Sequence, residues 1–362
     1  MKVLLSLFIF ISQFAAAQVI TGYVHDAETE EPLVGVSVYF DGTTLATVTD
    51  ETGAFSIKPQ QGINKALIFS YIGYEKIVLE NPTSYTSRLK VLMKASAETL
   101  DEVVITGKTI FSRKQMLRAF RKQFLGDNKG GRSCTIQNED DIVLYYNSGT
   151  NTLHAEAKRP LRIINKYLQY DINFDLAEFE VNYYSTSLEE NEIGSAFYAG
   201  TTLFKDTSKD GSADKRRRQA YRGSIAHLMR TIYNNDWENQ DFDWYVDKEH
   251  IAPDSCFAIT DSLNYKKITI KELPPMEVPG LTTMQGAPGV KDRILKRDFT
   301  KTKYVLMYRQ SAQTTINFTM REFYINEYGL FFPFNALLFA GHLGNMRAGD
   351  LLPDNYEYIE TD

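Results

Sequence analysis

The chain has 362 residues, of which 43% are hydrophobic, 24% charged and 13% aromatic. This apolar fraction excludes wholesale disorder, and 22 Gly with 11 Pro exclude a collagen-like or linker-like chain. Two cysteines exclude a disulfide-dense miniprotein and a four-thiolate metal site, and the formal net charge of -6 argues against general nucleic-acid binding. The length allows about two to three domains.

The first segment predicts export. Lys2 precedes an apolar run over residues 3–11, and residues 15–17 are alanines, which are the small residues that signal peptidase prefers. The run is shorter than the roughly 20 residues of a membrane-spanning helix. We therefore expect a signal peptide over residues 1–17 and an exported protein in the periplasm or associated with the outer membrane. We expect no transmembrane helix after cleavage.

Residues 19–95 alternate between apolar and polar side chains in short runs that are separated by turn residues, such as Asp41-Gly42 and Asp50 with Gly53. About seven such runs fit a small sandwich. The sequence therefore predicts a mainly β fold that begins with a seven-stranded β-sandwich over residues 18–97. The expected core positions are Val24, Val38, Phe55, Ile68 and Leu92.

Four ordered motifs in this region carry a family resemblance: Gly22-Tyr23-Val24, Glu31-Pro32-Leu33-Val34-Gly35-Val36, Thr49-Asp50-Glu51-Thr52-Gly53-Ala54-Phe55 and Phe69-Ser70-Tyr71-Ile72-Gly73-Tyr74. In this order they resemble the carboxypeptidase-like regulatory domain. The resemblance implies a transthyretin-like (prealbumin-like) sandwich. It also implies an exported Gram-negative envelope protein, because this domain stands at the N-terminus of TonB-dependent receptors and of other envelope proteins. It does not imply peptidase activity.

Residues 100–107 are similar to the stretch that follows the same domain in TonB-dependent receptors. The 255 residues after Gly107 are about half of what a plug and a 22-stranded barrel need, so we expect no transporter. Residues 98–110 are predicted to form a linker strand. The alternative is a strand that adds to the sheet of an envelope partner.

Residues 111–362 predict an aromatic-rich α+β domain with an antiparallel sheet and two main helices. Ser112 is placed to cap a helix over 113–125, and a second helix is expected over 213–234. Strands are expected over 142–146, 152–157, 168–176, 179–185, 196–204, 265–271, 301–309 and 314–325. Membrane-barrel strands alternate in the same way, but the two helix signals interrupt the series and favour a soluble sheet.

The second predicted helix carries a basic run beside an apolar face. Tyr221, Ile225, Leu228 and Ile232 recur at helical spacing, and Gly223 is expected at a close contact. The candidate partner-binding residues are Arg216, Arg217, Arg218, Arg222 and His227, which could bind the phosphates of lipopolysaccharide or an acidic envelope partner. The alternative is a solvated helix start whose arginines pair with the nearby aspartates 206, 210 and 214.

The search for catalytic motifs yields two weak candidates. His25 and Glu28 have the His-x-x-Glu spacing of a zinc site, but this spacing is common and stands at a strand end. A second candidate, for calcium or sugar, is the group Asp236, Asp241, Asp243 and Asp247 near Trp237 and Trp244, which lacks EF-hand spacing. Metalloprotease, nucleophile-elbow and P-loop motifs are absent from the sequence. We expect no catalytic, metal or cofactor site. Cys134 and Cys256 could pair or remain as buried thiols.

The sequence therefore predicts a non-enzymatic exported envelope protein. Its sandwich would be a docking module, and its larger domain would bind an envelope protein, an outer-membrane complex, a glycan or lipopolysaccharide, but no nucleic acid. Two alternatives remain open. One is a periplasmic hydrolase of peptides or glycans with its site in residues 111–362, and the other is a surface carbohydrate-binding component.

Overall fold

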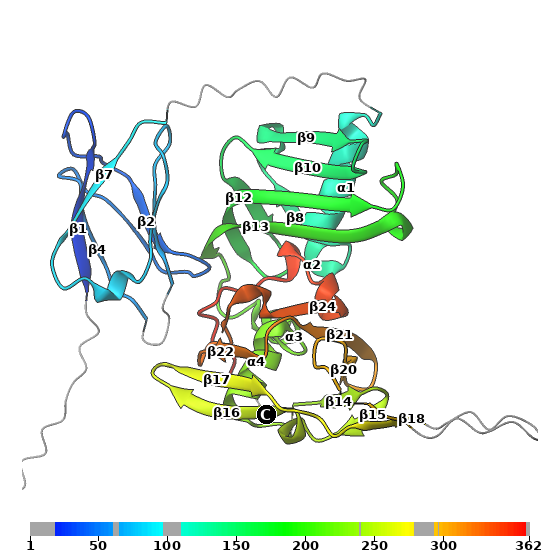
Figure 1. The fold of residues 1–362 in the computed structure, drawn as a ribbon. Helices are drawn as coiled ribbons and strands as arrows, with labels where there is room; N and C mark the ends of the chain where they lie inside the picture. Colours follow the sequence, from blue (N-terminus) through cyan, green and yellow to red (C-terminus); the bar gives the residue numbers. More distant parts are fainter. Residues whose placement is uncertain are drawn as a thin grey trace, which may run out of the picture. The chain divides into compact units, whose positions relative to one another are not determined.

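The structure is a computed structural model that describes residues 19–60, 65–96, 110–238, 240–278, 293–295 and 297–359. These residues form two compact units, one within residues 19–96 and the other mainly within residues 110–359 (Figure 1). The predicted signal peptide, residues 1–17, and positions 98–109 of the predicted linker lie outside the described residues. The predicted mainly β fold class is confirmed.

The first unit is a β-sandwich of seven strands, as predicted. The strands are β1 Ile20–Asp26, β2 Ser37–Phe40, β3 Ala46–Val48, β4 Ala54–Ile57, β5 Leu67–Ser70, β6 Ile77–Leu79 and β7 Leu89–Met93. One sheet has the order β4-β1-β7 and the other has the order β3-β2-β5-β6. Strand β1 is antiparallel to β4 and parallel to β7.

Four of the five predicted core positions of the sandwich are buried, namely Val24, Val38, Phe55 and Ile68. The prediction for Leu92 is wrong, because this side chain is 43% exposed. Its neighbours Val91 and Met93 are buried instead. Successive side chains of a strand point to opposite faces, so an error of one position in β7 exchanges the inner and outer side chains.

The first sheet of the second unit consists of β8 Cys134–Ile136, β9 Ile142–Asn147, β10 Thr152–Ala157, β11 Leu161–Asn165, β12 Tyr170–Tyr183 and β13 Ile193–Asp206. Its order is β8-β11-β12-β10-β9, and β13 pairs with β12. Figure 1 shows helix α1, Arg113–Leu125, across one face of this sheet. Ser112 caps α1 in a reciprocal capping box with Gln115, which confirms the predicted helix start.

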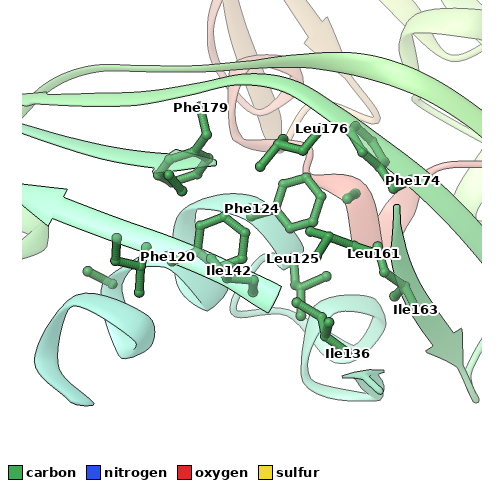
Figure 2. Close-up of a cluster of buried hydrophobic side chains, with 14 of the residues drawn as sticks. Phe120, Phe124, Leu125, Ile136, Ile142, Leu161, Ile163, Phe174, Leu176 and Phe179 are labelled. Atoms are coloured by element: carbon green, nitrogen blue, oxygen red, sulfur yellow. The ribbon is translucent and has the colours of Figure 1, made fainter. Parts of the chain in front are cut away.

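An aromatic core lies between α1 and this sheet. The rings of Phe120 and Phe124 stack with their centroids 5.0 Å apart, and Phe124 meets Phe174 of β12 edge-on at 4.9 Å. Figure 2 shows these rings with Leu161 and Ile163 of β11. The period-two pattern of β12 therefore serves to place its apolar side chains under the helix.

Two larger sheets enclose a second core, and a third sheet has only two strands. The five-stranded sheet has the order β15 Glu249–Ile251, β14 Phe242–Val246, β20 Tyr304–Tyr308, β21 Ala312–Phe318 and β24 Leu337–Gly341. The four-stranded sheet has the order β16 Phe257–Ser262, β17 Tyr265–Ile270, β22 Glu322–Ile325 and β23 Phe331–Phe332. In the two-stranded sheet, β18 Met276–Val278 pairs with β19 Arg293–Leu295. The second core includes Trp244, Tyr304 and Phe318. The second unit thus has several antiparallel sheets and two cores, whereas the sequence indicated one sheet.

The predicted helix over 213–234 is divided into α3 Asp214–Tyr221 and α4 Ile225–Asn234. Gly223 lies between them with φ at +75°, and a Cβ atom there would lie 2.6 Å from Cδ1 of Tyr308. Ser224 starts α4 by accepting a hydrogen bond from the backbone N–H of His227. The predicted close contact at Gly223 is present, but the prediction of one continuous helix is wrong.

The remaining helix is the short α2 Lys129–Arg132. No helix in the described part of the chain is both long and apolar enough to span a membrane. Cys134 and Cys256 are both free, and burial raises the pKa of each thiol to about 12. Of the two predicted states of the cysteines, the structure has the unpaired one.

Candidate functional site

A polar cavity of about 450 Å³ opens beside the break between α3 and α4. Its volume lies within the range of about 300–1,000 Å³ that is typical of small-molecule sites. We call it the arginine pocket and define it by six of its lining residues: Arg222, His227, Arg230, Asp241, Tyr308 and Arg309. It collects two of the five predicted partner-binding residues, Arg222 and His227.

Arg230 is held firmly by the backbone. This residue of α4 donates from Nε to the carbonyl of Tyr328 at 2.9 Å and from Nη2 to the carbonyl of Tyr356 at 2.8 Å. Its guanidinium carbon lies 5.1 Å from the ring centroid of Tyr221. Arg230 therefore contributes a fixed positive charge to the pocket while two of its five N–H donors serve the fold.

Arg222 and Arg309 are held at one atom only. Arg222 donates from Nε to the hydroxyl of Tyr358 at 2.8 Å, and Arg309 donates from Nε to Oδ2 of Asp241 at 2.8 Å. Both residues are exposed. Their terminal Nη groups have no hydrogen-bond partner among the described residues. They are therefore available to bind an anionic group, for which guanidinium has a matching planar geometry.

His227 is locked in one neutral tautomer. Its Nδ1 accepts a hydrogen bond of 2.9 Å from the backbone N–H of Gly223, which can only donate. The ring proton therefore lies on Nε2, which donates to Oε1 of Gln240 at 2.8 Å. Burial lowers the pKa of His227, and the charges of Arg222 and Arg230 act in the same direction. Both ring nitrogens are thus engaged.

Acidic and aromatic side chains complete the lining. Asp236 accepts a hydrogen bond of 3.1 Å from Nε2 of Gln240. The rings of Tyr221 and Tyr358 stack with centroids 4.6 Å apart, and burial raises the pKa of Tyr308, which keeps its hydroxyl neutral. The pocket therefore offers cationic donors, carboxylate acceptors and aromatic faces together.

Arg217 does not reach the pocket. Its side chain is buried, and its two Nη atoms donate to the carboxylate of Asp206 at 2.7 Å each. The guanidinium carbon lies 3.9 Å from the ring centroid of Tyr170. The pairing with Asp206 agrees with the predicted alternative, but Arg217 is not solvated, because the neighbouring sheet covers it. This residue stabilises the fold.

The two arginines beside it are half-buried. Arg216 donates from Nε to the carbonyl of Tyr167. Arg218 accepts the backbone N–H of Arg222 on its carbonyl as α3 ends. Neither residue lines the arginine pocket. The structure therefore separates the predicted basic cluster into residues that hold α3 and one residue, Arg222, that faces a cavity.

Sequence reasoning missed most of the pocket. Arg230 lies three positions after His227 in α4, so helical spacing could have found it. Tyr308, Arg309 and Tyr358 come from distant segments, and no sequence pattern links them to α4.

Of the calcium or sugar candidate, Asp236 and Asp241 line the arginine pocket, whereas the remaining sequence candidates lie elsewhere. His25 is half-buried on β1, and Glu28 is exposed beyond its end. No group of three His, Cys, Asp or Glu residues that could hold a metal occurs among the described residues. Trp244 is 1% exposed in the second core, and Trp237 meets it edge-on at 6.0 Å, so the tryptophans are packing residues rather than an exposed sugar platform.

A second cavity of about 260 Å³ shares Arg222 with the arginine pocket and contains Ser224, His342 and Asp350. The Asp350 carboxylate accepts hydrogen bonds from Nδ2 of Asn128 at 2.8 Å, and burial raises its pKa. The Ser224 hydroxyl caps α4. These contacts hold α2 and α4 in place, and within the described residues no hydrogen bond joins His342 to Ser224 or Asp350.

Comparison with known proteins identifies the first unit. Residues 20–105 match the family model described as CarboxypepD_reg-like domain. The TonB-dependent receptor SusC of Bacteroides thetaiotaomicron is 42% identical over 110 residues, which are 29% of this chain and 10% of that receptor. The TonB-dependent receptor P39 of Formosa agariphila is 40% identical over 76 residues, which are 21% of this chain and 7% of that receptor. The matches thus span a tenth or less of these relatives.

A solved cohesin–X-dockerin complex from Acetivibrio cellulolyticus is 24% identical and covers 22% of this chain and 58% of that chain, with a TM-score of 0.18. A score this low carries no structural argument. The receptor similarity favours an envelope location, and the family match ends well before the arginine pocket. The predicted resemblance is confirmed: residues 20–105 of this chain are a CarboxypepD_reg-like domain, with similarity to TonB-dependent receptors.

Proposed function

We propose that this chain is a non-enzymatic envelope protein that binds a small anionic ligand in the arginine pocket. One observation carries the proposal. Arg222 and Arg309 are each anchored through Nε, while their Nη groups remain available at the same cavity. Anchoring at one atom orients the guanidinium before the ligand arrives, so little side-chain entropy is lost on binding.

The electrostatics of the cavity support an anion. Three guanidinium groups line it against the carboxylates of Asp236 and Asp241, so the lining has a net positive charge. The rings of Tyr221, Tyr308 and Tyr358 lower the local polarity beside the arginines. Charge-assisted hydrogen bonds strengthen in such surroundings.

Binding without a chemical step is proposed because both ring nitrogens of His227, the histidine of the pocket, are engaged. A general base needs a free lone pair within hydrogen-bond reach of its proton. His227 uses Nδ1 for Gly223 and Nε2 for Gln240, and Asp241 holds Arg309. The alternative of a hydrolase in residues 111–362 would require one of the His227 bonds to open or Asp236 to serve as the base.

The sandwich is proposed to dock the chain to an envelope protein or an outer-membrane complex in the periplasm or at the outer membrane. Its similarity to TonB-dependent receptors supports this role. The anion-binding pocket would then be presented at that location by the second unit.

The test uses thermal melting of residues 18–362 with acetate, citrate and inorganic phosphate at low ionic strength, where surface charges are least screened. A ligand at about 100 times its dissociation constant stabilises the folded state by roughly 2.7 kcal/mol. We expect a saturable rise in melting temperature that Arg309→Met removes.

Arg159→Met is the matched control, because Arg159 is also an exposed arginine that donates to an aspartate, Asp141, outside the pocket. This variant should respond to anions as the wild-type chain does. Absence of a saturable shift with any anion, or an equal loss in Arg159→Met, would contradict the proposal.

A further inference from the structure

We infer that the ligand of the arginine pocket is an acidic sugar whose carboxylate binds Arg222 and Arg309 and whose hydroxyl groups bind the acidic side of the pocket. This inference rests on the proposed anion-binding function and specifies its ligand class. The argument comes from the acceptor side of the cavity, which a simple anion would leave unused.

Asp236 is aligned by a chain of three hydrogen bonds. The N–H of Gly223 donates to Nδ1 of His227 at 2.9 Å, Nε2 of His227 donates to Gln240 at 2.8 Å, and Gln240 donates to Oδ2 of Asp236 at 3.1 Å. Each bond fixes the orientation of the next group. His227 is therefore a positioning residue that acts on the ligand through Gln240 and Asp236.

This alignment matters because Asp236 is exposed and lines the cavity. Its Oδ2 atom accepts one hydrogen bond, from Gln240, whereas a carboxylate has about four acceptor positions. The donors that suit it are hydroxyl groups. A compact anion such as acetate has no donor for this acceptor and is repelled by its charge.

Aromatic faces supply the third feature. Tyr308 and Tyr358 line the same cavity as Asp236, and Arg222 and Arg309 stand beside their rings, with guanidinium carbons 5.8 Å from the Tyr358 centroid and 5.4 Å from the Tyr308 centroid. Tyr308 is buried, so the apolar C–H face of a sugar ring would pack on the half-buried ring of Tyr358. A ligand with a carboxylate, several hydroxyls and a C–H face is a hexuronate, whereas an acidic peptide lacks the hydroxyl groups.

The experiment is isothermal titration calorimetry of residues 18–362 with D-galacturonate and D-glucuronate, compared with D-galactose, D-glucose, acetate and inorganic phosphate. We expect at least one uronate to bind about tenfold or more tightly than the matching neutral sugar and than acetate. The neutral sugar lacks the hydrogen bonds of the carboxylate to the arginines, and acetate lacks those of the hydroxyl groups to Asp236.

Variants separate the two sides of the pocket. Asp236→Asn should weaken uronate binding about tenfold and should not weaken acetate binding, because it removes a charge that repels anions. His227→Asn should also reduce the preference for uronate over acetate, as Asp236→Asn does. Arg309→Met should remove binding of both ligands. Arg159→Met is again the control.

The outcomes are distinct. If acetate and phosphate bind through Arg309 but no uronate binds more tightly than acetate, the acidic-sugar inference is overturned and the anion-binding proposal stands. If Asp236→Asn leaves the preference for uronate unchanged, the hydroxyl-binding role of Asp236 is overturned. If no anion binds, both the inference and the proposed function fail.

Discussion

At the scale of single residues, the partners of a side chain decide its role more than its type does. Arg217 and Arg222 belong to one basic segment, yet Arg217 is buried against Asp206 and Arg222 is exposed at a cavity. The sequence shows the charges of these arginines but not their partners. Asp206, which binds Arg217, is one of the three aspartates that the sequence offered as partners. Tyr170 and Tyr358 reach Arg217 and Arg222 only through the tertiary fold.

The buried Arg217 provides a test at this scale. Arg217→Met removes two hydrogen bonds to Asp206 and one each to the carbonyls of Leu168 and Gln169. We expect it to lower the free energy of unfolding by about 1–3 kcal/mol, because Asp206 is half-exposed and regains water. Arg218→Met should change it by no more than about 0.5 kcal/mol. Urea denaturation measures both, and equal effects would contradict the assignment.

His227 predicts a pH dependence of stability. Burial depresses the pKa of His227 below its ordinary value of about 6.5, so the unfolded chain binds a proton at a higher pH than the folded chain. The stability that neutral His227 contributes is therefore complete above about pH 6.5 and falls as the pH drops below it. His227→Asn keeps an acceptor for Gly223 without titrating. The stability of this variant should fall less than that of the wild-type chain between pH 7 and pH 5.

Thermal melting in that pH range measures the difference between the two proteins, in which the other titrating groups cancel. An identical pH dependence would show that His227 is not held neutral in the folded chain.

At the scale of elements, local patterns located most strands and α1 but not the break between α3 and α4. The periodicity from Tyr221 to Ile232 continues across Gly223, so it predicts one helix. The break depends on Tyr308, a residue of distant β20 that leaves no room for a Cβ atom at Gly223. In the same way, the alternation of a short strand does not show which of its two sets of alternate side chains faces the core, so it wrongly predicts Leu92 as a core residue.

The apolar face of α4 gives the prediction at this scale. Leu228 is fully buried in the second core. Leu228→Ala should lower the free energy of unfolding by about 2–5 kcal/mol, because it leaves a cavity. Leu263→Ala makes the same chemical change at an exposed turn of the same unit and should cost about 0.5 kcal/mol or less. Thermal or urea unfolding compares them, and similar effects would mean that α4 packs differently.

At the scale of the whole molecule, a unit that matches a recognisable domain family is followed in the chain by a unit whose pocket lies outside the family match. The family motifs are short and contiguous, so the sequence predicted the first unit well. The pocket is assembled from α4, the turn after β20 and the segment around Tyr358. Four of its lining residues were sequence candidates, Arg222 and His227 for a partner and Asp236 and Asp241 for calcium or sugar. No local pattern joined the two groups or pointed to the remaining residues, because contacts of such sequence separation leave none.

The first unit has a core of its own, which includes Val24, Phe69 and Met93. We therefore expect residues 18–97, produced alone, to give a β-type circular dichroism spectrum and a cooperative thermal transition. The core supplies the cooperativity without help from the second unit. A coil-like spectrum or a gradual, non-cooperative melt would contradict the proposed domain boundaries.

The central claim is that Arg222 and Arg309 together bind an anionic ligand, and calorimetric titration of citrate into the double variant Arg222→Met/Arg309→Met tests it most directly. The wild-type chain should bind citrate at one saturable site at low ionic strength, and the double variant should show no saturable heat while keeping its melting temperature. Citrate binding by the folded double variant with the wild-type affinity would contradict the account.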